Sequence, residues 1–314
     1  MEELSIIKDY MGAYRKSRIL FTANNLKVFD QLAYLTSAKD VAQRLGADLR
    51  ATTILLDALV SIDLITKEGS LYVNTSIASQ CLVTGGPLTQ TDIISHNDSL
   101  WKNWSGLDDV VRTGKSNRVA HDHRAFIMGM HNLASLKVKE LFDVIDLYGV
   151  KSAIDIGGGP GTYAIEMARR GISVTLFDRQ ETIDIASEVI TGAGVEGIKF
   201  LPGDFTTHSI GSGYDLALIS QVVHSGSIQE NVELIKAVKD ALNPNGKVVI
   251  HEFYIEDSMT QPFNSAMFSI NMLVATEAGR CYTVGEMAGW LKEAGFQHIT
   301  HNLLTETVVV IGRL

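Results

Sequence analysis

A glycine-rich segment at residues 155–163 is the part of the sequence best suited to hold a ligand. In it an acidic residue, Asp155, is followed by alternate glycines at Gly157, Gly159 and Gly161. Glycine lets a backbone turn sharply and approach a ligand closely. The segment follows a strand pattern and precedes a helical one, which is where the carboxyl edge of a parallel sheet binds ligands.

Two further acidic residues follow at the expected ends of the next two strands. Asp178 ends the second strand, where a carboxylate can accept hydrogen bonds from ribose hydroxyls. Asp204 and Phe205 follow the third, where a carboxylate can meet an exocyclic amine and a ring can stack on adenine. The dinucleotide fingerprint GxGxxG is broken by Thr162, so a nicotinamide oxidoreductase is the weakest enzyme interpretation.

The second half of the chain alternates strand-like and helical patterns, which is typical of an α/β fold. Five apolar runs predict strands, and they lie at residues 153–156, 173–177, 198–201, 215–219 and 247–251. An Asn-Pro-Asn-Gly turn is expected at 243–246. Two last runs, 298–304 and 307–311, are too close together for a crossover helix and predict an antiparallel hairpin. The result is a doubly wound sheet of seven strands.

The first 95 residues read as helices followed by a small hairpin, the order of a winged helix. Ser37 is expected to cap a helix that ends at Gly46, and Asp48 to cap the next one. Residues 36–75 carry four basic and five acidic side chains, whereas contacts to DNA phosphates need several Lys or Arg. We therefore expect this module to pair with a second copy of itself rather than to bind DNA. A single helical segment through Trp101 and Val111 is expected to end at Gly114.

The composition argues against several further classes of protein. The 314 residues carry a net charge of −9, which argues against nucleic-acid or anionic membrane partners. No apolar stretch approaches the roughly 18 residues of a membrane span, and the N-terminal residues lack a signal-peptide pattern. The two cysteines, Cys81 and Cys281, form no CxxC motif and suit the reducing cytoplasm.

On these motifs the sequence resembles the class I methyltransferases that depend on S-adenosylmethionine (SAM). More narrowly, it is similar to small-molecule O-methyltransferases, which include plant caffeate and bacterial antibiotic-tailoring enzymes. The resemblance implies a winged-helix-like dimerisation domain over 1–95, a helical connector contributing to the substrate pocket over 96–150, and a Rossmann-like catalytic domain over 151–314. It also implies a homodimer. The implied SAM contacts are Asp155, Gly157, Gly159, Gly161, Asp178, Asp204, Phe205 and Ser220.

The same resemblance assigns His224 as the general base and Glu252 as the carboxylate that orients it. An imidazole, with an unperturbed pKa of about 6.5, can take the proton of a hydroxyl group at neutral pH. A carboxylate on the other ring nitrogen fixes the tautomer and stabilises the imidazolium. The sequence departs from the family's pattern at three positions. The family usually has Asp and Trp where this sequence has Ser225 and Gly226, and a second carboxylate where this sequence has Cys281. Cys281 is expected to be a small buried side chain.

The acceptor pocket is predicted mainly from flexible and aromatic side chains, which line sites for flat molecules well. The candidates are Met128, Met130, Met267, Phe268, Asn271 and Met272. The acceptor implied by the resemblance is an aromatic or heteroaromatic hydroxyl. A metal site is suggested by His121 and His123, with His131 or His96 as a third ligand. A solvated loop is the favoured interpretation of this histidine pair, and no metal is expected.

Two alternatives stay open at this point. A nitrogen or carbon acceptor needs less help from a base, which the thinner support around His224 would allow. In a different class, the winged helix could serve a transcriptional regulator with SAM as effector or with a vestigial SAM site.

Overall fold

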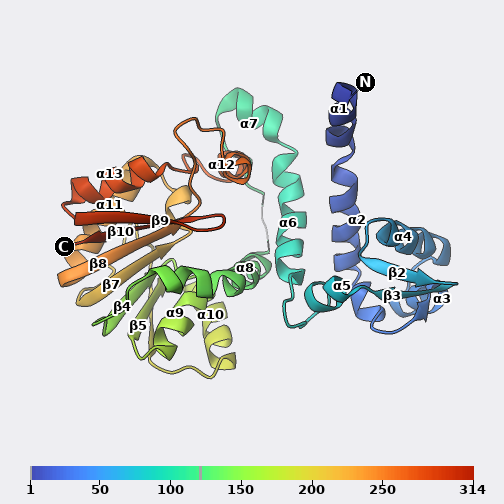
Figure 1. Cartoon of the computed structure of the whole chain (residues 1–314), viewed down its shortest axis with the longest axis horizontal. Coiled ribbons are helices and arrows are strands. Elements are labelled where there is room, and N and C mark those ends of the chain that lie inside the picture. Colours follow the sequence, from blue (N-terminus) through green and yellow to red (C-terminus); the bar gives the residue numbers. More distant parts are fainter. Residues whose placement is uncertain (1, 120–121) are drawn as a thin grey trace. The chain divides into compact units, whose positions relative to one another are not determined.

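The computed structural model describes residues 2–119 and 122–314, which divide into two compact units (Figure 1). The first unit holds residues 2–101 and 122–133, and the second holds 102–119 and 134–314. Each unit has its own buried hydrophobic core. Among the described helices, none combines the length and the apolar character needed to cross a membrane.

The first unit begins with helices and a three-stranded antiparallel sheet of order β1-β3-β2. Its α-helices and strands before residue 90 are α1 (Glu2–Gly12), α2 (Tyr14–Asn25), β1 (Thr36–Ser37), α3 (Ala38–Leu45), α4 (Leu49–Ser61), β2 (Ile65–Glu68), β3 (Leu71–Asn74) and α5 (Ser76–Cys81). The predicted caps are confirmed. The Ser37 side chain accepts from the Asp40 amide at the start of α3, Asp48 accepts from the Ala51 amide at the start of α4, and Gly46 ends α3 in the left-handed region.

The middle of the chain forms α6 (Thr91–Trp104), α7 (Leu107–Thr113) and α8 (His123–Val144). The prediction of a single helix ending at Gly114 is wrong in one respect. The chain forms two helices, because α6 ends at Trp104 and α7 begins after Gly106. A Cβ at Gly106 would lie 2.1 Å from the Asn117 side-chain nitrogen, so the following segment packs directly on this glycine. Gly114 does end α7, with a φ of 69°.

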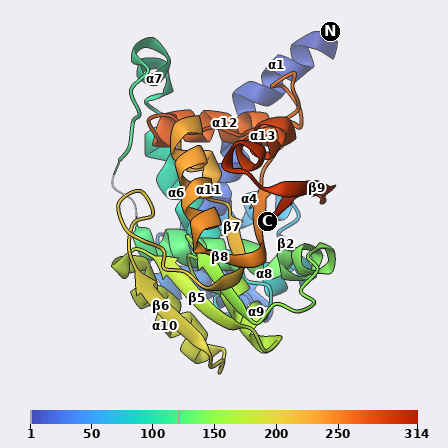
Figure 2. The same cartoon turned by 90° about the vertical axis from the view of Figure 1, so that its left-hand side faces the viewer.

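The second unit is built on a seven-stranded sheet of order β6-β5-β4-β7-β8-β10-β9. The strands are β4 (Ser152–Ile156), β5 (Ser173–Asp178), β6 (Ile198–Pro202), β7 (Tyr214–Ser220), β8 (Leu242–Glu252), β9 (Gln297–Leu303) and β10 (Val308–Arg313). The first five are parallel, and β10 runs antiparallel between β8 and β9. In Figure 2, β6 and β9 lie at opposite edges. The predicted sheet and hairpin are confirmed.

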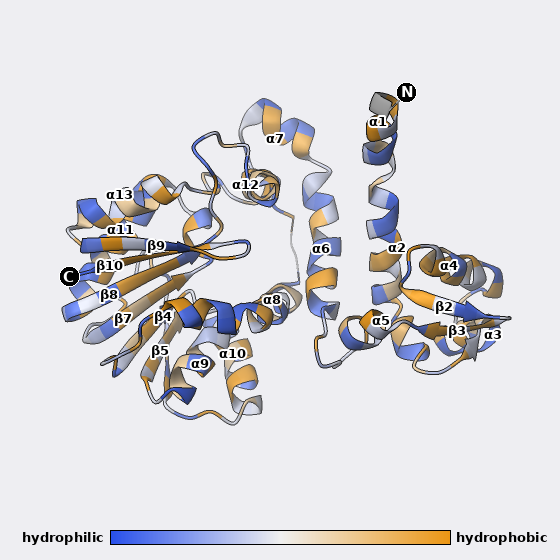
Figure 3. Cartoon of the chain, in the orientation of Figure 1, coloured by the Kyte–Doolittle hydropathy of each residue, from blue (hydrophilic) through white to orange (hydrophobic). Residues whose placement is uncertain are grey.

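Helices cover both faces of this sheet (Figure 1). They are α9 (Thr162–Arg169), α10 (Gln180–Gly192), α11 (Ile228–Ala241) and α13 (Val284–Ala294), and α12 (Phe263–Ala275) lies between β8 and α13 in the chain. One core lies between the sheet and α11 with α13, and the other lies between the sheet and α9, α10 and the end of α8. Figure 3 shows the central strands as predominantly hydrophobic, as expected for strands buried on both faces.

The prediction of a turn outside the strands at residues 243–246 is wrong. These residues lie inside β8, where the pairing with β7 shifts between Tyr214 and Leu216. Asn245 takes a φ of 64°, which lets the strand accommodate the extra residues as a bulge. The strand then continues to Glu252 at the carboxyl edge, where the candidate site lies.

Candidate functional site

The glycine-rich segment connects β4 to α9 at the carboxyl edge of the sheet. Gly157, Gly159 and Gly161 have φ values of 65°, 54° and 79°, which only glycine adopts readily. The Gly157 and Gly158 amides donate to the carbonyl of Phe177 on β5, at 2.8 and 3.3 Å. The loop is therefore held against the neighbouring strand.

The space around each glycine separates a packing role from a binding role. A Cβ at Gly157 would lie 2.6 Å from Val222, and one at Gly161 would lie 2.9 Å from Ile190. At Gly159 the nearest described atom would be 4.0 Å away. Gly157 and Gly161 are thus required by close packing, whereas Gly159 borders open space that a ligand can fill.

Asp178, the last residue of β5, fixes the position of this loop. Its Oδ2 accepts from the Gly159 amide at 2.9 Å, and its Oδ1 accepts from the Arg179 amide at 2.7 Å. Each carboxylate oxygen has a second lone pair, so the half-buried group can still accept from a ligand hydroxyl.

Asp155, at the end of β4, is buried beneath the loop, with 1% of its surface exposed. Burial and the nearby charge of Asp178 raise its pKa to about 7, against a smaller opposing effect of the Ala164 amide. Its Oδ2 atom has no hydrogen-bond partner among the described residues. Unpartnered buried polar atoms are uncommon, and a cationic or hydrogen-donating ligand group would satisfy this one.

Asp204 and Phe205 follow β6 at the same edge. Asp204 Oδ1 accepts from the Thr206 amide at 2.9 Å and from its hydroxyl at 2.6 Å, and these bonds lower the pKa of Asp204. The Phe205 ring is partly buried and packs against the core that includes α11 and α13. The carboxylate is ionised and oriented by its own turn.

His224 and Glu252 form a direct pair. His224 Nδ1 lies 2.9 Å from Glu252 Oε1, and the His224 amide donates to Glu252 Oε2 at 3.3 Å. The Glu252 side chain is fully buried, while 13% of the His224 side chain is exposed. A carboxylate accepts from Nδ1–H, so the neutral ring carries its proton there and Nε2 is left as the proton acceptor.

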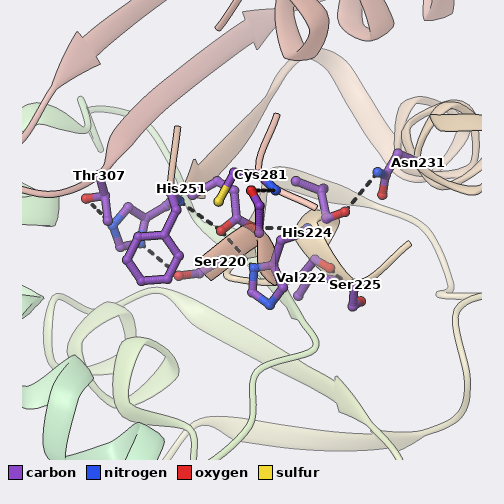
Figure 4. A network of polar contacts seen from close by, with 12 residues as sticks. Ser220, Val222, His224, Ser225, Asn231, His251, Cys281 and Thr307 are labelled. Atoms are coloured by element: carbon purple, nitrogen blue, oxygen red, sulfur yellow. Dashed lines mark hydrogen bonds and ion pairs between the residues drawn. The ribbon is translucent and has the colours of Figure 1, made fainter. Parts of the chain in front are cut away.

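The turn that carries His224 is pinned from several directions (Figure 4). Asn231 on α11 donates to the Val223 carbonyl at 2.9 Å, and the Tyr282 hydroxyl donates to the Gly226 carbonyl at 2.6 Å. The Ser225 hydroxyl, in place of the family's Asp, donates to the Val222 carbonyl at 2.7 Å. Asn231 and Tyr282 were not predicted from the sequence as residues of this site. A polar residue at a core position of α11 was the available signal.

Cys281 is fully buried near this turn, as expected of a small core side chain. Burial raises the pKa of its thiol to about 11, so it is neutral at physiological pH. Gly279 lies beside it, and a Cβ there would come within 2.3 Å of the His224 carbonyl oxygen. The segment that departs from the family pattern therefore packs directly against the backbone of the candidate base.

The pocket residues predicted on α12 differ in their surroundings. The Phe268 ring meets the His224 ring edge to face, with centroids 4.9 Å apart. Asn271 Oδ1 accepts from the Trp104 indole at 3.0 Å, Met267 is 42% exposed, and Met272 is buried. Met128 and Met130 belong to the first unit, so their role in the pocket stays a prediction.

Phe253 is a neighbour of the site that sequence analysis missed. Its ring centroid lies 4.6 Å from that of Phe268 and 6.5 Å from that of His224. Its position directly after Glu252 was the available signal. The two phenylalanines and the imidazole place three rings together at this edge of the sheet.

Within residues 2–119 and 122–314, no cluster of three or more His, Cys, Asp or Glu side chains is arranged to hold a metal ion. His121 lies outside the described residues. His96 and His123 both contact the Phe126 ring, with centroids 5.0 and 6.4 Å away. Burial lowers the pKa of His131.

Comparison with known proteins finds O-methyltransferases both by sequence and by structure. Residues 90–297 match the O-methyltransferase domain family, and residues 8–84 match the O-methyltransferase dimerisation domain. The 3-hydroxy-5-methyl-1-naphthoate 3-O-methyltransferase of Streptomyces sahachiroi is 29% identical, over 94% of this chain and 90% of that protein. The acetylserotonin O-methyltransferase of Gallus gallus is 28% identical, over 94% and 92%. The crystal structure of human N-acetylserotonin methyltransferase in complex with SAM has a TM-score of 0.91 at 25% identity, over 100% and 98%.

Proposed function

This chain belongs to the O-methyltransferase family, and we propose that it transfers the methyl group of SAM to the hydroxyl of a small aromatic or heteroaromatic molecule. The pairing of His224 with the buried Glu252 at the carboxyl edge is the observation that carries the choice of a hydroxyl acceptor. A hydroxyl must lose its proton during methyl transfer, and this pair is built to accept one.

The residues around the glycine loop fit SAM. Gly159 borders open space, Asp178 retains acceptor lone pairs, and the buried Asp155 carboxyl has an unpartnered oxygen for a cationic group. We assign the ribose to Asp178 and the adenine to Asp204 and Phe205. When bound, SAM supplies an electrophilic methyl group on a sulfonium. The loop's part is to hold that group in line with the acceptor oxygen, which contributes much of the acceleration in such reactions.

His224 is the general base in this proposal. Its Nε2 takes the proton of the acceptor hydroxyl, and the negative charge of Glu252 stabilises the imidazolium that forms. A base of this kind contributes about 10²–10⁴-fold to the rate. Neutral Cys281 takes no part in proton transfer.

An aromatic acceptor is supported by the rings at the site. Phe268 lies next to His224, and Phe253 packs on Phe268, so a flat molecule entering beside the base meets aromatic faces. The naphthoate relative is named for an aromatic hydroxyl substrate. Met267, Asn271 and Met272 on α12 extend the proposed pocket. Met128 and Met130, on α8, remain proposed substrate contacts.

We propose a homodimer formed through the N-terminal domain, residues 1–95, with 96–150 as connector and 151–314 as catalytic domain. The match to a dimerisation domain supports this assembly. Helix α1 exposes large apolar side chains that a second copy would cover, and these are Leu4, Ile6, Ile7, Tyr10 and Met11. The free thiols of Cys81 and Cys281 fit the proposed cytoplasmic location.

Calorimetric titration with SAM tests the cofactor assignment. We expect one saturable SAM site per chain, and its absence in the wild-type protein would overturn the proposal. Gly159→Ala places a Cβ in the open space and should weaken binding. Gly171→Ala is the matched control, because Gly171 has a φ of 83° and faces no described atom within 4 Å, but it lies outside the site. Both glycines have positive φ, so both variants carry backbone strain, and weaker SAM binding in Gly159→Ala than in Gly171→Ala reports on the ligand.

A further inference from the structure

Strand β8 ends in two consecutive ionisable residues that serve opposite faces of the sheet. Adjacent side chains on a strand point in opposite directions, so while Glu252 binds His224, His251 points the other way. His251 is the register partner of Ser220 on β7. Its Nδ1 lies 2.8 Å from Ser220 Oγ, and its Nε2 lies 3.0 Å from Thr307 Oγ1 (Figure 4).

This Ser220–His251–Thr307 chain is shielded from water. The three residues are exposed by 9%, 1% and 2% respectively. Burial lowers the pKa of His251 to about 4, so the ring is neutral at physiological pH. A neutral imidazole has one donor and one acceptor nitrogen, so a bond on one nitrogen dictates the direction of the bond on the other.

The far end of the chain is anchored. Thr307 follows a turn whose Thr305 amide and hydroxyl both donate to Glu140 Oε1 on α8, each at 2.7 Å. Lys137 on the same helix forms an ion pair of 2.6 Å with Glu306. The Thr307 hydroxyl is therefore held on a fixed support, and the imidazole between it and Ser220 cannot easily reorient.

The near end reaches the cofactor side of the sheet. Ser220 follows the last core residue of β7, next to β4 and its glycine loop. The Tyr163 ring packs edge-on against His251, with centroids 5.9 Å apart, and its hydroxyl interacts with Ser220. Ser220 has one hydrogen and two lone pairs, so when its oxygen accepts from His251 Nδ1–H and from the Tyr163 hydroxyl, its hydrogen is left for another acceptor.

We propose that His251 is a positioning residue for cofactor binding, which holds the Ser220 hydroxyl in the orientation that contacts SAM while Thr307 holds the other ring nitrogen. This inference rests on the proposed function, because it assumes that Ser220 contacts SAM. It assigns a purpose to a histidine that takes no part in the His224–Glu252 pair.

The test is the dissociation constant for SAM in a set of variants, with thermal unfolding measured alongside. Ser220→Ala and His251→Leu should each weaken binding by about 5–10-fold, the loss expected for one hydrogen bond. Because His251 acts through Ser220, the double variant should bind no more weakly than Ser220→Ala alone. His251→Asn keeps a polar group near the Nδ1 position and should restore most of the affinity. His301→Leu, at an exposed histidine of β9, is the control and should bind as the wild type does.

The outcomes separate this inference from the proposed function. Failure of the wild-type protein to bind SAM would overturn the proposed function. Normal SAM binding by His251→Leu, with or without a lower unfolding temperature, would show a purely structural histidine and overturn the inference. Additive losses in the double variant would also overturn it. If His251→Leu does not fold, His251→Asn and Thr307→Val replace it, and Thr307→Val should weaken SAM binding while His251→Asn largely preserves it.

Discussion

Glu252 holds both the ring and the backbone of His224. Its Oε1 lies 2.9 Å from Nδ1 of the ring, and its Oε2 accepts from the His224 amide at 3.3 Å. Oε1 also accepts from the Phe253 amide at 2.8 Å. One fully buried carboxylate thus sets the position, tautomer and charge environment of the imidazole. This arrangement supplies a single carboxylate partner where the family pattern has more acidic residues.

Replacing that carboxylate should impair catalysis more than cofactor binding. In Glu252→Gln the side-chain amide can donate to Nδ1, which places the ring proton on Nε2 and removes the acceptor. We expect kcat to fall at least about tenfold with the dissociation constant for SAM unchanged. Glu256→Gln, at an exposed residue four positions later, is the control and should be neutral. Equal kcat in Glu252→Gln and wild type would contradict the assigned role.

Gly279 should be sensitive to the smallest added side chain. Its Cβ would lie 2.3 Å from the His224 carbonyl oxygen and 2.6 Å from Thr276 Oγ1, so Gly279→Ala must displace the turn that carries the base. We expect kcat to fall by about tenfold or more, because catalysis tolerates little misplacement of a base. Steady-state kinetics against Gly289→Ala, in α13 with no described atom within 4 Å, provides the comparison. Unchanged kcat in Gly279→Ala would refute the packing argument.

Asp155 should make stability depend on pH when no cofactor is bound. Its pKa rises from 3.8 to about 7 on folding, so the folded chain holds this proton more tightly than the unfolded chain. Its contribution to stability is full below about pH 3.8 and declines as the pH rises to about 7. Asp155→Asn removes this decline, so it should gain stability relative to wild type over that range, by up to about 4 kcal/mol. Denaturant unfolding at several pH values measures the difference, and a pH-independent difference would contradict it.

The same carboxyl should link SAM binding to pH. A cationic ligand favours the ionised form, so wild-type affinity for SAM should rise between about pH 6 and about pH 8 with release of a proton. The affinity of Asp155→Asn should be weaker and should lack this rise. Calorimetry in buffers of different ionisation enthalpy counts the released proton. An affinity with the same pH dependence in both proteins would argue against a contact between Asp155 and the cation.

Cys281 should resist modification in the folded protein. Its thiol is fully buried with a pKa of about 11, whereas Cys81 is partly exposed. Alkylation at mildly alkaline pH followed by mass spectrometry should label Cys81 first and Cys281 only after unfolding, because the thiolate is the reactive form. Rapid labelling of Cys281 in the native state would show that the segment at 279–281 opens readily.

The strands could be predicted because strands buried on both faces appear in the sequence as continuous apolar runs. The loop between Asp155 and Gly161 could also be predicted, since a turn of this kind restricts residue type locally. The contacts that hold His224 were not predictable in this way. Asn231 and Tyr282 contact the His224 turn from segments that are brought together only in the folded chain. Nothing in the sequence around Gly279 indicates that it packs against the His224 carbonyl. The bulge at 243–246 likewise depends on the pairing of β7 with β8.

An assay of methyl transfer from SAM that carries a labelled methyl group tests whether this protein methylates a hydroxyl with His224 as the base. Wild-type protein and His224→Ala are compared on simple phenols, hydroxynaphthoates and acetylserotonin, and the methylated atom is located by mass spectrometry and NMR. We expect a methyl ether as the product, with kcat about 10²–10⁴-fold lower in His224→Ala at an unchanged dissociation constant for SAM. Methylation at nitrogen or carbon, or full turnover by His224→Ala on the wild-type substrate, would contradict this expectation.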